Sequence, residues 1–265
     1  MTQRLRLTTK WLLCAAAALM VLTCTSSAQA ATVRITVDNI GPATGGTYVT
    51  SIFAGFHDGS FSLGSVGSVA SAELQTLAEL GQTAPLQGVV TGAGFEAGQV
   101  GAPGPSPLAP NTSRSEDFVI DLTTNNQLTL ASMILPSSDF FLANLSGPLD
   151  LSTLTAAGDT VNVTLSTLYD AGTELNDLAT SPGNPLVGLT PGVATNNVAD
   201  TNNLIRAVTP ATAFDDFLNN PTNFSPTISS LNVTVELIAV PEPSTGFAIC
   251  AVLGGLTIRR RRRAK

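Results

Sequence analysis

Residues 31 to 240, the central region of this 265-residue chain, contain no cysteine. The three cysteines lie outside it, two in the first 30 residues and one in an apolar segment near the C-terminus: Cys14, Cys24 and Cys250. Disulfides therefore cannot stabilise the central region, and its stability must come from an apolar core. A region of this length is large enough to bury such a core as a single domain.

Basic residues are also scarce. The central region has 18 acidic residues but only three basic ones, Arg34, Arg114 and Arg206, so its net charge is −15. A surface of this charge repels nucleic acid and anionic lipid, and we expect no nucleic-acid partner. Such a surface attracts divalent cations. Acidity that serves only solubility in a saline setting explains the charge equally well.

The side chains that most enzymes use are few in this region. His57 is its only histidine, so a zinc site would lack ligands. A Ser/His/Asp arrangement would have to combine His57 with Asp58, and the G-x-S-x-G elbow is absent. A glycosidase with two carboxylates is conceivable, but the region has no tryptophan and only Tyr48 and Tyr169 to stack on sugars. We therefore predict that the protein is not an enzyme and that His57 is a hydrogen-bonded structural residue.

Short segments with alternating apolar residues, typical of half-buried strands, recur along the central region. Strands are expected at residues 33–39, 47–56, 117–122, 128–135, 161–168 and 231–240. This pattern predicts an all-β fold, an antiparallel β-sandwich.

One short helix and two long loops complete the expected fold. The helix starts after Ser68 or Ser71 and ends at Gly81, and its apolar residues share a face: Leu74, Leu77 and Ala78. Residues 92–115 and 180–210 are rich in residues that favour turns, such as Gly and Pro, and are expected to be loops.

Two of the predicted strands lead into carboxylates. Residues 128–135 are followed by Pro136-Ser137-Ser138-Asp139, and residues 161–168 by Tyr169-Asp170-Ala171-Gly172-Thr173-Glu174. Gly172 allows a sharp turn that brings Glu174 back towards Asp170. Ca²⁺ binds roughly six to eight oxygen ligands, so Asp139, Asp170 and Glu174 are the predicted metal ligands, completed by carbonyls and waters. Mg²⁺ is the alternative metal, and a solvated acidic turn without metal is the alternative to both.

Together, Pro136-Ser137-Ser138-Asp139-Phe140 and Tyr169 to Glu174 resemble the spondin domain of the F-spondin family. Members of that family have a P-S-x-D-aromatic motif, then a strand, then a Y-D-A-G-T-[DE] motif. Residues 51–60 and 70–86 resemble its preceding strand and short helix, so the likeness spans most of residues 33 to 240. The resemblance implies a C2-like β-sandwich that binds Ca²⁺. Phe140 stands where animal members usually have Trp, and Glu174 where they often have Asp. We expect none of the other modules of the animal proteins, so the adhesive and neuronal roles of those proteins are not expected to carry over.

The N-terminal 30 residues have the three parts of a signal peptide. A basic start is followed by the apolar run 11–22 and by the small-residue cleavage signal Ala28-Gln29-Ala30. The apolar run is short for a membrane span. We therefore predict export and a mature protein that starts near Ala31.

Residues 241–265 resemble a PEP-CTERM sorting signal, with Pro241-Glu242-Pro243, the apolar run 246–258 and the arginines 259–263. The resemblance implies processing by an exosortase-type sorting enzyme in a Gram-negative-type bacterium that makes extracellular polysaccharide. The apolar run is shorter than a standard transmembrane helix, and the arginines would hold its end on the cytoplasmic side. We therefore expect transient membrane anchoring through 246–258. A plain C-terminal anchor is the alternative.

The sequence thus predicts three parts: a signal peptide (1–30), a spondin-like β-sandwich (31–240) and a sorting segment (241–265). The expected protein is an exported, non-enzymatic, calcium-binding module of the cell envelope or extracellular matrix. Its expected role is adhesion or interaction with an extracellular protein or glycan. A metal-free structural protein of the matrix or cell surface is the alternative function.

Overall fold

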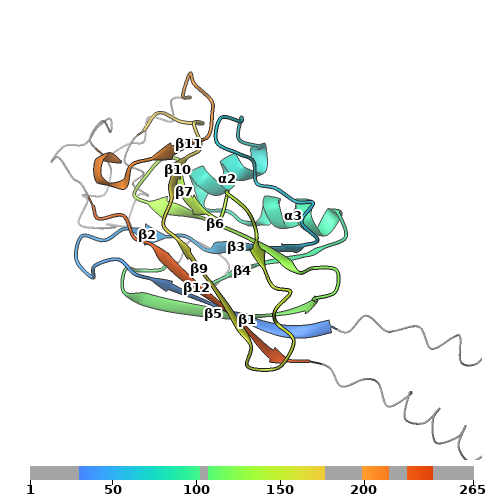
Figure 1. Cartoon of the computed structure of the whole chain (residues 1–265). Helices are drawn as coiled ribbons and strands as arrows, with labels where there is room; N and C mark the ends of the chain where they lie inside the picture. Colours follow the sequence, from blue (N-terminus) through green and yellow to red (C-terminus); the bar gives the residue numbers. More distant parts are fainter. Residues whose placement is uncertain (1–29, 102–106, 177–198, 215–225, 241–265) are drawn as a thin grey trace, which may run out of the picture. The chain divides into compact units, whose positions relative to one another are not determined.

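The computed structural model describes residues 30–101, 107–176, 199–214 and 226–240 (Figure 1). The predicted signal peptide, apart from Ala30, and the predicted sorting segment lie outside the described residues. The same is true of residues 180–198 in the second predicted loop. Residues Ala30–Val240 form one compact unit.

The first of two β-sheets has four antiparallel strands in the order β5-β1-β12-β9. Their bounds are β1 Ala30–Asn39, β5 Thr112–Asp121, β9 Thr160–Leu165 and β12 Leu231–Ala239. In β1, Val33, Ile35 and Val37 are fully buried, whereas the residues between them are partly or fully exposed. One face of this sheet therefore packs on the core and the other faces solvent, as the alternating pattern predicts.

The second sheet is built around β6, with the strand order β11-β10-β7-β6-β3-β4 and with β2 and β8 also paired to β6. Its strands are β2 Tyr48–Val49, β3 Ile52–His57, β4 Glu96–Val100, β6 Gln127–Leu135, β7 Phe140–Ala143, β8 Leu149–Asp150, β10 Leu168–Asp170 and β11 Arg206–Val208. These strands pair antiparallel with one another. Strands β3, β6 and β7 are buried along almost their whole length, because both faces of this sheet are covered.

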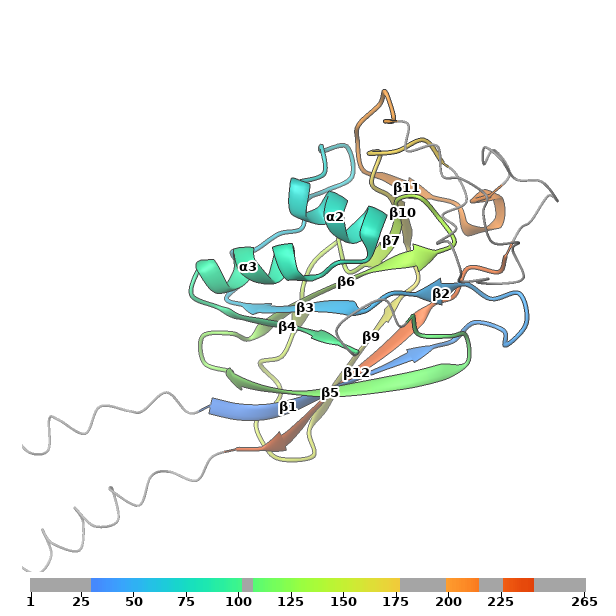
Figure 2. The ribbon, with the colours of Figure 1, turned by 180° about the vertical axis from the view of Figure 1, so that it is seen from behind.

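Two apolar layers explain that burial. The larger layer lies between the sheets and combines residues of β1 and β12 with residues of β3 and β6, among them Ile35, Val235, Phe56 and Leu130. The smaller layer lies between the second sheet and two helices, α2 Ala72–Leu80 and α3 Ala84–Gly92. Figure 2 shows both helices along the side of the second sheet that faces away from the first sheet. The predicted all-β antiparallel sandwich is confirmed.

The helix predicted between Ser71 and Gly81 is α2. The Ser71 hydroxyl accepts a hydrogen bond from the Leu74 amide (3.2 Å), and Gly81 ends the helix with a φ of 65°. Ser71, not Ser68, is therefore the N-cap. The second helix, α3, was not predicted, so the expectation of one short helix is wrong in number. Its sequence contains one internal glycine, Gly88, a second glycine at its end, Gly92, and two valines, and Thr83 before it makes no side-chain cap.

Four other expectations need correction. The loop predicted at 92–115 contains β4 and the start of β5, and the loop predicted at 180–210 contains β11. The single strand predicted at 47–56 is two short strands, β2 and β3. The single strand predicted at 161–168 also divides: β9 belongs to the first sheet, whereas Leu168 begins β10 in the second. The chain therefore passes from one sheet to the other at Ser166–Thr167.

Candidate functional site

Asp139 and Asp170 meet at one end of the second sheet. Asp139 directly precedes β7, and Asp170 is the last residue of β10, which pairs with β7 so that Asp170 lies opposite Phe140. The Ala171 amide donates to the Asp139 main-chain carbonyl (3.2 Å) and extends this pairing by one step. Both aspartates are almost completely buried, at 0 % and 1 % exposure. The structure thus brings together two of the three predicted site residues.

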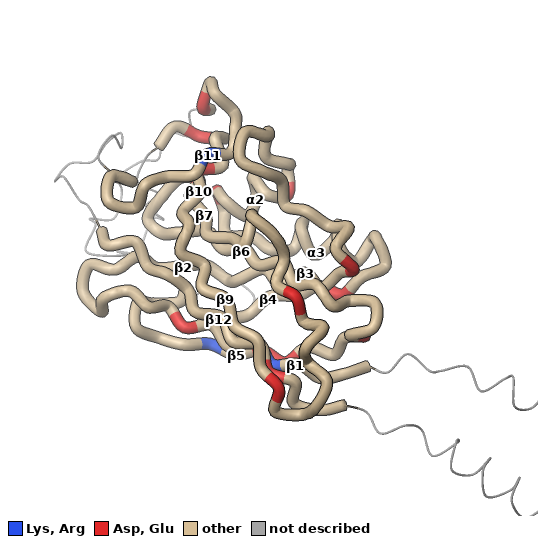
Figure 3. The backbone as a smooth tube through the Cα atoms, viewed as in Figure 1, with Lys and Arg blue, Asp and Glu red and all other residues tan. Residues whose placement is uncertain are grey.

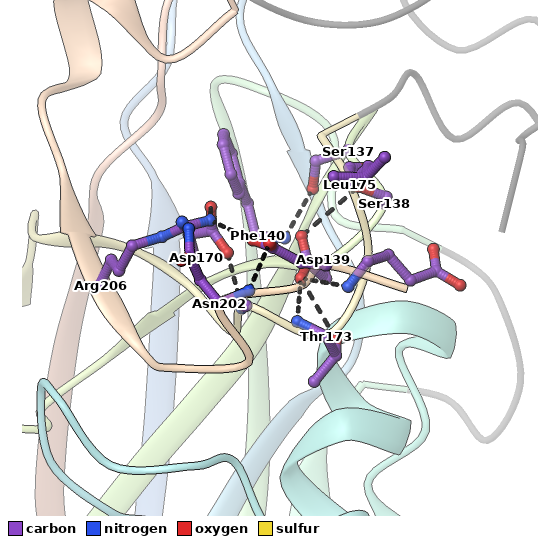
Figure 4. Close-up of polar contacts among 12 residues, drawn as sticks. Ser137, Ser138, Asp139, Phe140, Asp170, Thr173, Leu175, Asn202 and Arg206 are labelled. Carbon is purple, nitrogen blue, oxygen red and sulfur yellow. Dashed lines mark hydrogen bonds and ion pairs between the residues drawn. The ribbon is translucent and has the colours of Figure 1, made fainter. Parts of the chain in front are cut away.

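The Asp139 carboxylate organises the turn that follows β10. Its Oδ2 atom accepts hydrogen bonds from the Thr173 amide (2.9 Å), the Thr173 hydroxyl (3.2 Å) and the Glu174 amide (3.1 Å), as Figure 4 shows. Bonds from main-chain amides to a buried carboxylate are among the stronger hydrogen bonds in proteins. The third predicted ligand, Glu174, is therefore held to Asp139 through its main-chain amide.

Serine side chains shape the other half of the site. The Ser137 hydroxyl donates to the Ile134 carbonyl (2.6 Å) and accepts from the Phe140 amide (3.1 Å), which closes the turn between β6 and β7. The Ser138 hydroxyl donates to the Leu175 carbonyl (3.2 Å) and so links this turn to the one after β10. The Pro-Ser-Ser-Asp motif is thus a structural unit that presents Asp139 to the neighbouring loop.

Gly172 is required for the second turn. Its φ is 68°, in the left-handed region that favours glycine, and its amide donates to Asp170 Oδ1 (2.6 Å). The main chain of Leu204 packs directly against its Cα. The turn predicted around Gly172 is confirmed, and the absence of a side chain at Gly172 also makes room for the segment that leads to β11.

Asp170 also forms an ion pair with an arginine of the same chain, Arg206. Arg206 begins β11 and lies opposite Asp170 in the β10–β11 pair. Its Nη2 atom lies 2.7 Å from Asp170 Oδ2 and 2.7 Å from Asp200 Oδ2. In Figure 3, basic and acidic segments of the backbone lie next to one another near β11. Neither Arg206 nor Asp200 was predicted as a site residue, although Arg206 is one of only three bases in a strongly acidic region.

The pKa values of two groups in the site, Asp139 and Arg206, are shifted. Burial, and then the charge of Asp170, raise the pKa of the Asp139 carboxyl to about 6, against the hydrogen bonds from Glu174 and Thr173 that favour its ionised form. Burial lowers the pKa of the Arg206 guanidinium, but the bonds and charges of Asp170 and Asp200 outweigh it and raise that pKa overall. A positive charge next to these carboxylates therefore stabilises the site.

The donor set fits a cation that prefers oxygen, because its side chains offer carboxylates and hydroxyls and neither thiol nor imidazole. Asp139 and Asp170 would hold such an ion, with Glu174 on the adjoining turn. Within the described ranges, however, no three His, Cys, Asp or Glu side chains form a group that could hold a metal ion. Calcium binding by Asp139, Asp170 and Glu174 therefore stays a prediction.

His57 lies elsewhere and has a structural role. Its Nδ1 atom accepts from the Gly59 amide (2.9 Å), so Nε2 carries the proton and donates to the Thr129 hydroxyl (2.8 Å). The ring is fully buried and packs edge-on against Phe61. Burial lowers the pKa of His57 despite the charge of Asp58. Both ring nitrogens are therefore engaged in holding β3 to β6 and shaping the turn after β3.

A family model decides the relationship of this chain to known proteins. Residues 42–189, more than half of the chain, match the Spondin_N family. The chain belongs to the Spondin_N family. The match includes Asp139, Asp170 and Glu174, whereas Asp200 and Arg206 lie beyond its end. Spondin_N is a non-catalytic, extracellular-type domain family. A search of curated proteins finds no match.

The residues that the structure describes include no helix of the length and apolar character needed to cross a membrane. The apolar runs 11–22 and 246–258 lie outside the described residues.

Proposed function

We propose that this Spondin_N chain is an exported, non-enzymatic interaction module that is delivered to the cell envelope or the extracellular polysaccharide matrix and acts there in adhesion. The observation that carries the proposal is the pair of motifs at 136–140 and 169–174. Both lie within the family match, and they fold against each other into one buried polar centre. His57, the residue that a Ser/His/Asp hydrolase would need, is engaged in structural hydrogen bonds.

The first test concerns location and adhesion. Antibodies against the central region should bind intact cells or the extracellular polysaccharide fraction, and cells that lack the protein should attach less well to surfaces or to one another. Restoring the gene should restore attachment, whereas a chain without the apolar run 246–258 should not. Protein confined to the cytoplasm would contradict the proposal.

We further propose that the Asp139–Asp170 centre binds Ca²⁺, with Glu174 as third ligand. Support comes from two buried carboxylates at adjoining strand ends and from the oxygen-only character of the site. A bound ion would neutralise the carboxylates and tie the β6–β7 turn to the turn after β10. Metal analysis of the purified protein, followed by calcium titration after chelation, tests this directly. Protein that neither retains nor binds calcium would leave the metal-free matrix protein as the function.

A further inference from the structure

We propose that Arg206 is the built-in counter-cation of the Asp139–Asp170 centre and that it competes with calcium for Asp170, so that it sets the affinity of the site for the metal. The second half of this inference rests on the proposed calcium binding. The first half, that Arg206 holds the centre together without metal, stands on the contacts of Arg206 alone.

Strand register brings Arg206 to the site. Arg206 pairs directly with Asp170, and the segment before it is fixed on its other side by two main-chain bonds: the Ile205 amide donates to the Ser68 carbonyl (2.9 Å), and the Gly67 amide donates to the Ile205 carbonyl (2.9 Å). The backbone at this position is therefore anchored from both sides. The contact between Arg206 and Asp170 is a property of the fold, not of a freely moving surface side chain.

The guanidinium bridges two buried carboxylates. The side chains of Asp170 and Asp200 are 2 % and 7 % exposed, whereas the Arg206 side chain is 37 % exposed. Figure 4 shows Arg206 beside Asp170. Two carboxylates this deeply buried are costly unless a positive charge and hydrogen bonds satisfy them. The central region has only two other bases: Arg34, which pairs with exposed Asp117, and Arg114, which donates to the Pro107 carbonyl.

The bridge also fastens the segment that follows residue 198 onto the site. The Asp200 amide donates to the Thr173 carbonyl (3.2 Å), and Glu174 forms a β-bridge with Ala199. Arg206 then adds an ionic link between Asp200 and Asp170. The Arg206 guanidinium thus holds the segment with Asp200 against the Asp139–Asp170 centre.

A metal ion at Asp170 must share or replace one of the partners of that carboxylate. Oδ1 accepts from the Gly172 amide, which is part of the main chain and cannot leave without unmaking the turn. Oδ2 accepts from Arg206, a long side chain with over a third of its surface in solvent. Arg206 is therefore the partner that the metal ion displaces from Asp170 Oδ2. Calcium would bring two charges in place of one, and Arg206 could keep Asp200.

The test compares three forms of the purified full chain: wild type, R206Q and the matched control R34Q. The control removes an ion pair of similar length, Arg34–Asp117 at 2.7 Å, in which both side chains are almost half exposed. In EDTA, R206Q should melt about 5 °C or more below wild type, whereas R34Q should stay within about 2 °C. Calcium titrated at constant ionic strength should then stabilise R206Q at a concentration about fivefold or more below that needed by wild type.

The outcomes separate the two halves. Equal melting temperatures of wild type and R206Q in EDTA would overturn the inference, whatever calcium does. If no form responds to calcium but R206Q alone is destabilised in EDTA, calcium binding fails while the counter-cation role is supported. An equal calcium response of R206Q and wild type would overturn the competition. Should R206Q fail to fold, the triple variant D170N/D200N/R206Q decides. Recovery of a folded protein supports the role, since this variant removes both buried charges that R206Q leaves unpaired, and failure to recover opposes it.

Discussion

Gly172 and Leu204 are packed main chain to main chain: a Cβ atom placed on Gly172 would lie 2.6 Å from the Leu204 amide nitrogen. The same glycine has a φ of 68°. Gly172→Ala should therefore destabilise the protein by about 2 kcal/mol or more, from the strained backbone conformation and from the displacement of Leu204. Chemical denaturation measures the loss.

Gly88 provides the control for that substitution. It lies inside α3, and a Cβ atom there would meet nothing within 4 Å. Gly88→Ala should leave stability unchanged or raise it by up to about 1 kcal/mol. Equal effects of the two substitutions would show that the turn after β10 does not depend on glycine.

The buried Asp139 should make stability depend on pH in the metal-free protein. Its folded-state pKa of about 6 lies above the ordinary aspartate value, so the folded state binds the extra proton between these two values. Stability is therefore greater below this window and falls by about 3 kcal/mol as the pH rises through it. Unfolding in EDTA at pH 4 to 7 measures this trend.

Asp139→Asn isolates the effect, because its side-chain oxygen can still accept from Thr173 and Glu174 but no longer titrates. His57 acts in the opposite sense: its lowered pKa means that stability is lost as the pH falls below the ordinary histidine value. The difference between wild type and D139N removes that contribution. A difference that stays constant from pH 4 to 7 would contradict the assignment of Asp139.

His57→Gln should cost stability without costing function. The substitution removes the bonds to Thr129 and Gly59 and leaves space around Phe61, with an expected loss of about 1 to 3 kcal/mol. Secretion and calcium binding should be unchanged at a temperature where the variant is folded. A hydrolytic activity that is present in the wild type and lost in this variant would show that the protein is an enzyme.

Calcium should raise the melting temperature. At a hundredfold excess over the dissociation constant, binding adds about 2.7 kcal/mol, which corresponds to roughly 5–10 °C for a domain of this size. Asp170→Asn should remove most of this rise. Sodium chloride at matched ionic strength is the control for general screening of the acidic surface. If wild type and D170N respond alike, Asp170 is no ligand.

The two ends of the chain should be processed. Mass spectrometry of the native protein should find a start near Ala31 and no arginine tail, as Ala28-Gln29-Ala30 and Pro241-Glu242-Pro243 predict. Substitution of the Pro-Glu-Pro residues should leave the tail in place and hold the protein in the membrane fraction. A native C-terminus at Lys265 would favour the plain anchor.

The parts of the fold that were predicted correctly are specified by residues that lie close together in the sequence. β1 and β12 alternate because one face of their sheet meets solvent, and α2 has both its Ser71 cap and its Gly81 end. The turn of Asp170 and Gly172 is likewise contained in a few residues. Such features need no knowledge of distant segments.

The missed parts depend on residues far away in the sequence. Gly98 in β4 looks like a loop glycine, yet the ring of Phe118 occupies the space beside it, 2.6 Å from where a Cβ would be. The change of sheet between β9 and β10 cannot be read from a continuous alternating pattern. Arg206 is 36 positions from Asp170, and only the β10–β11 register reveals the ion pair.

The position of β12 has a mechanical consequence. It is an inner strand of the first sheet, hydrogen-bonded to β1 on one side and to β9 on the other, and the C-terminal segment follows it directly. Tension along β12 would have to shear both ladders at once instead of opening them bond by bond. A molecule tethered through its C-terminus and pulled by flowing water would thus carry the load on a strand that is hydrogen-bonded on both sides.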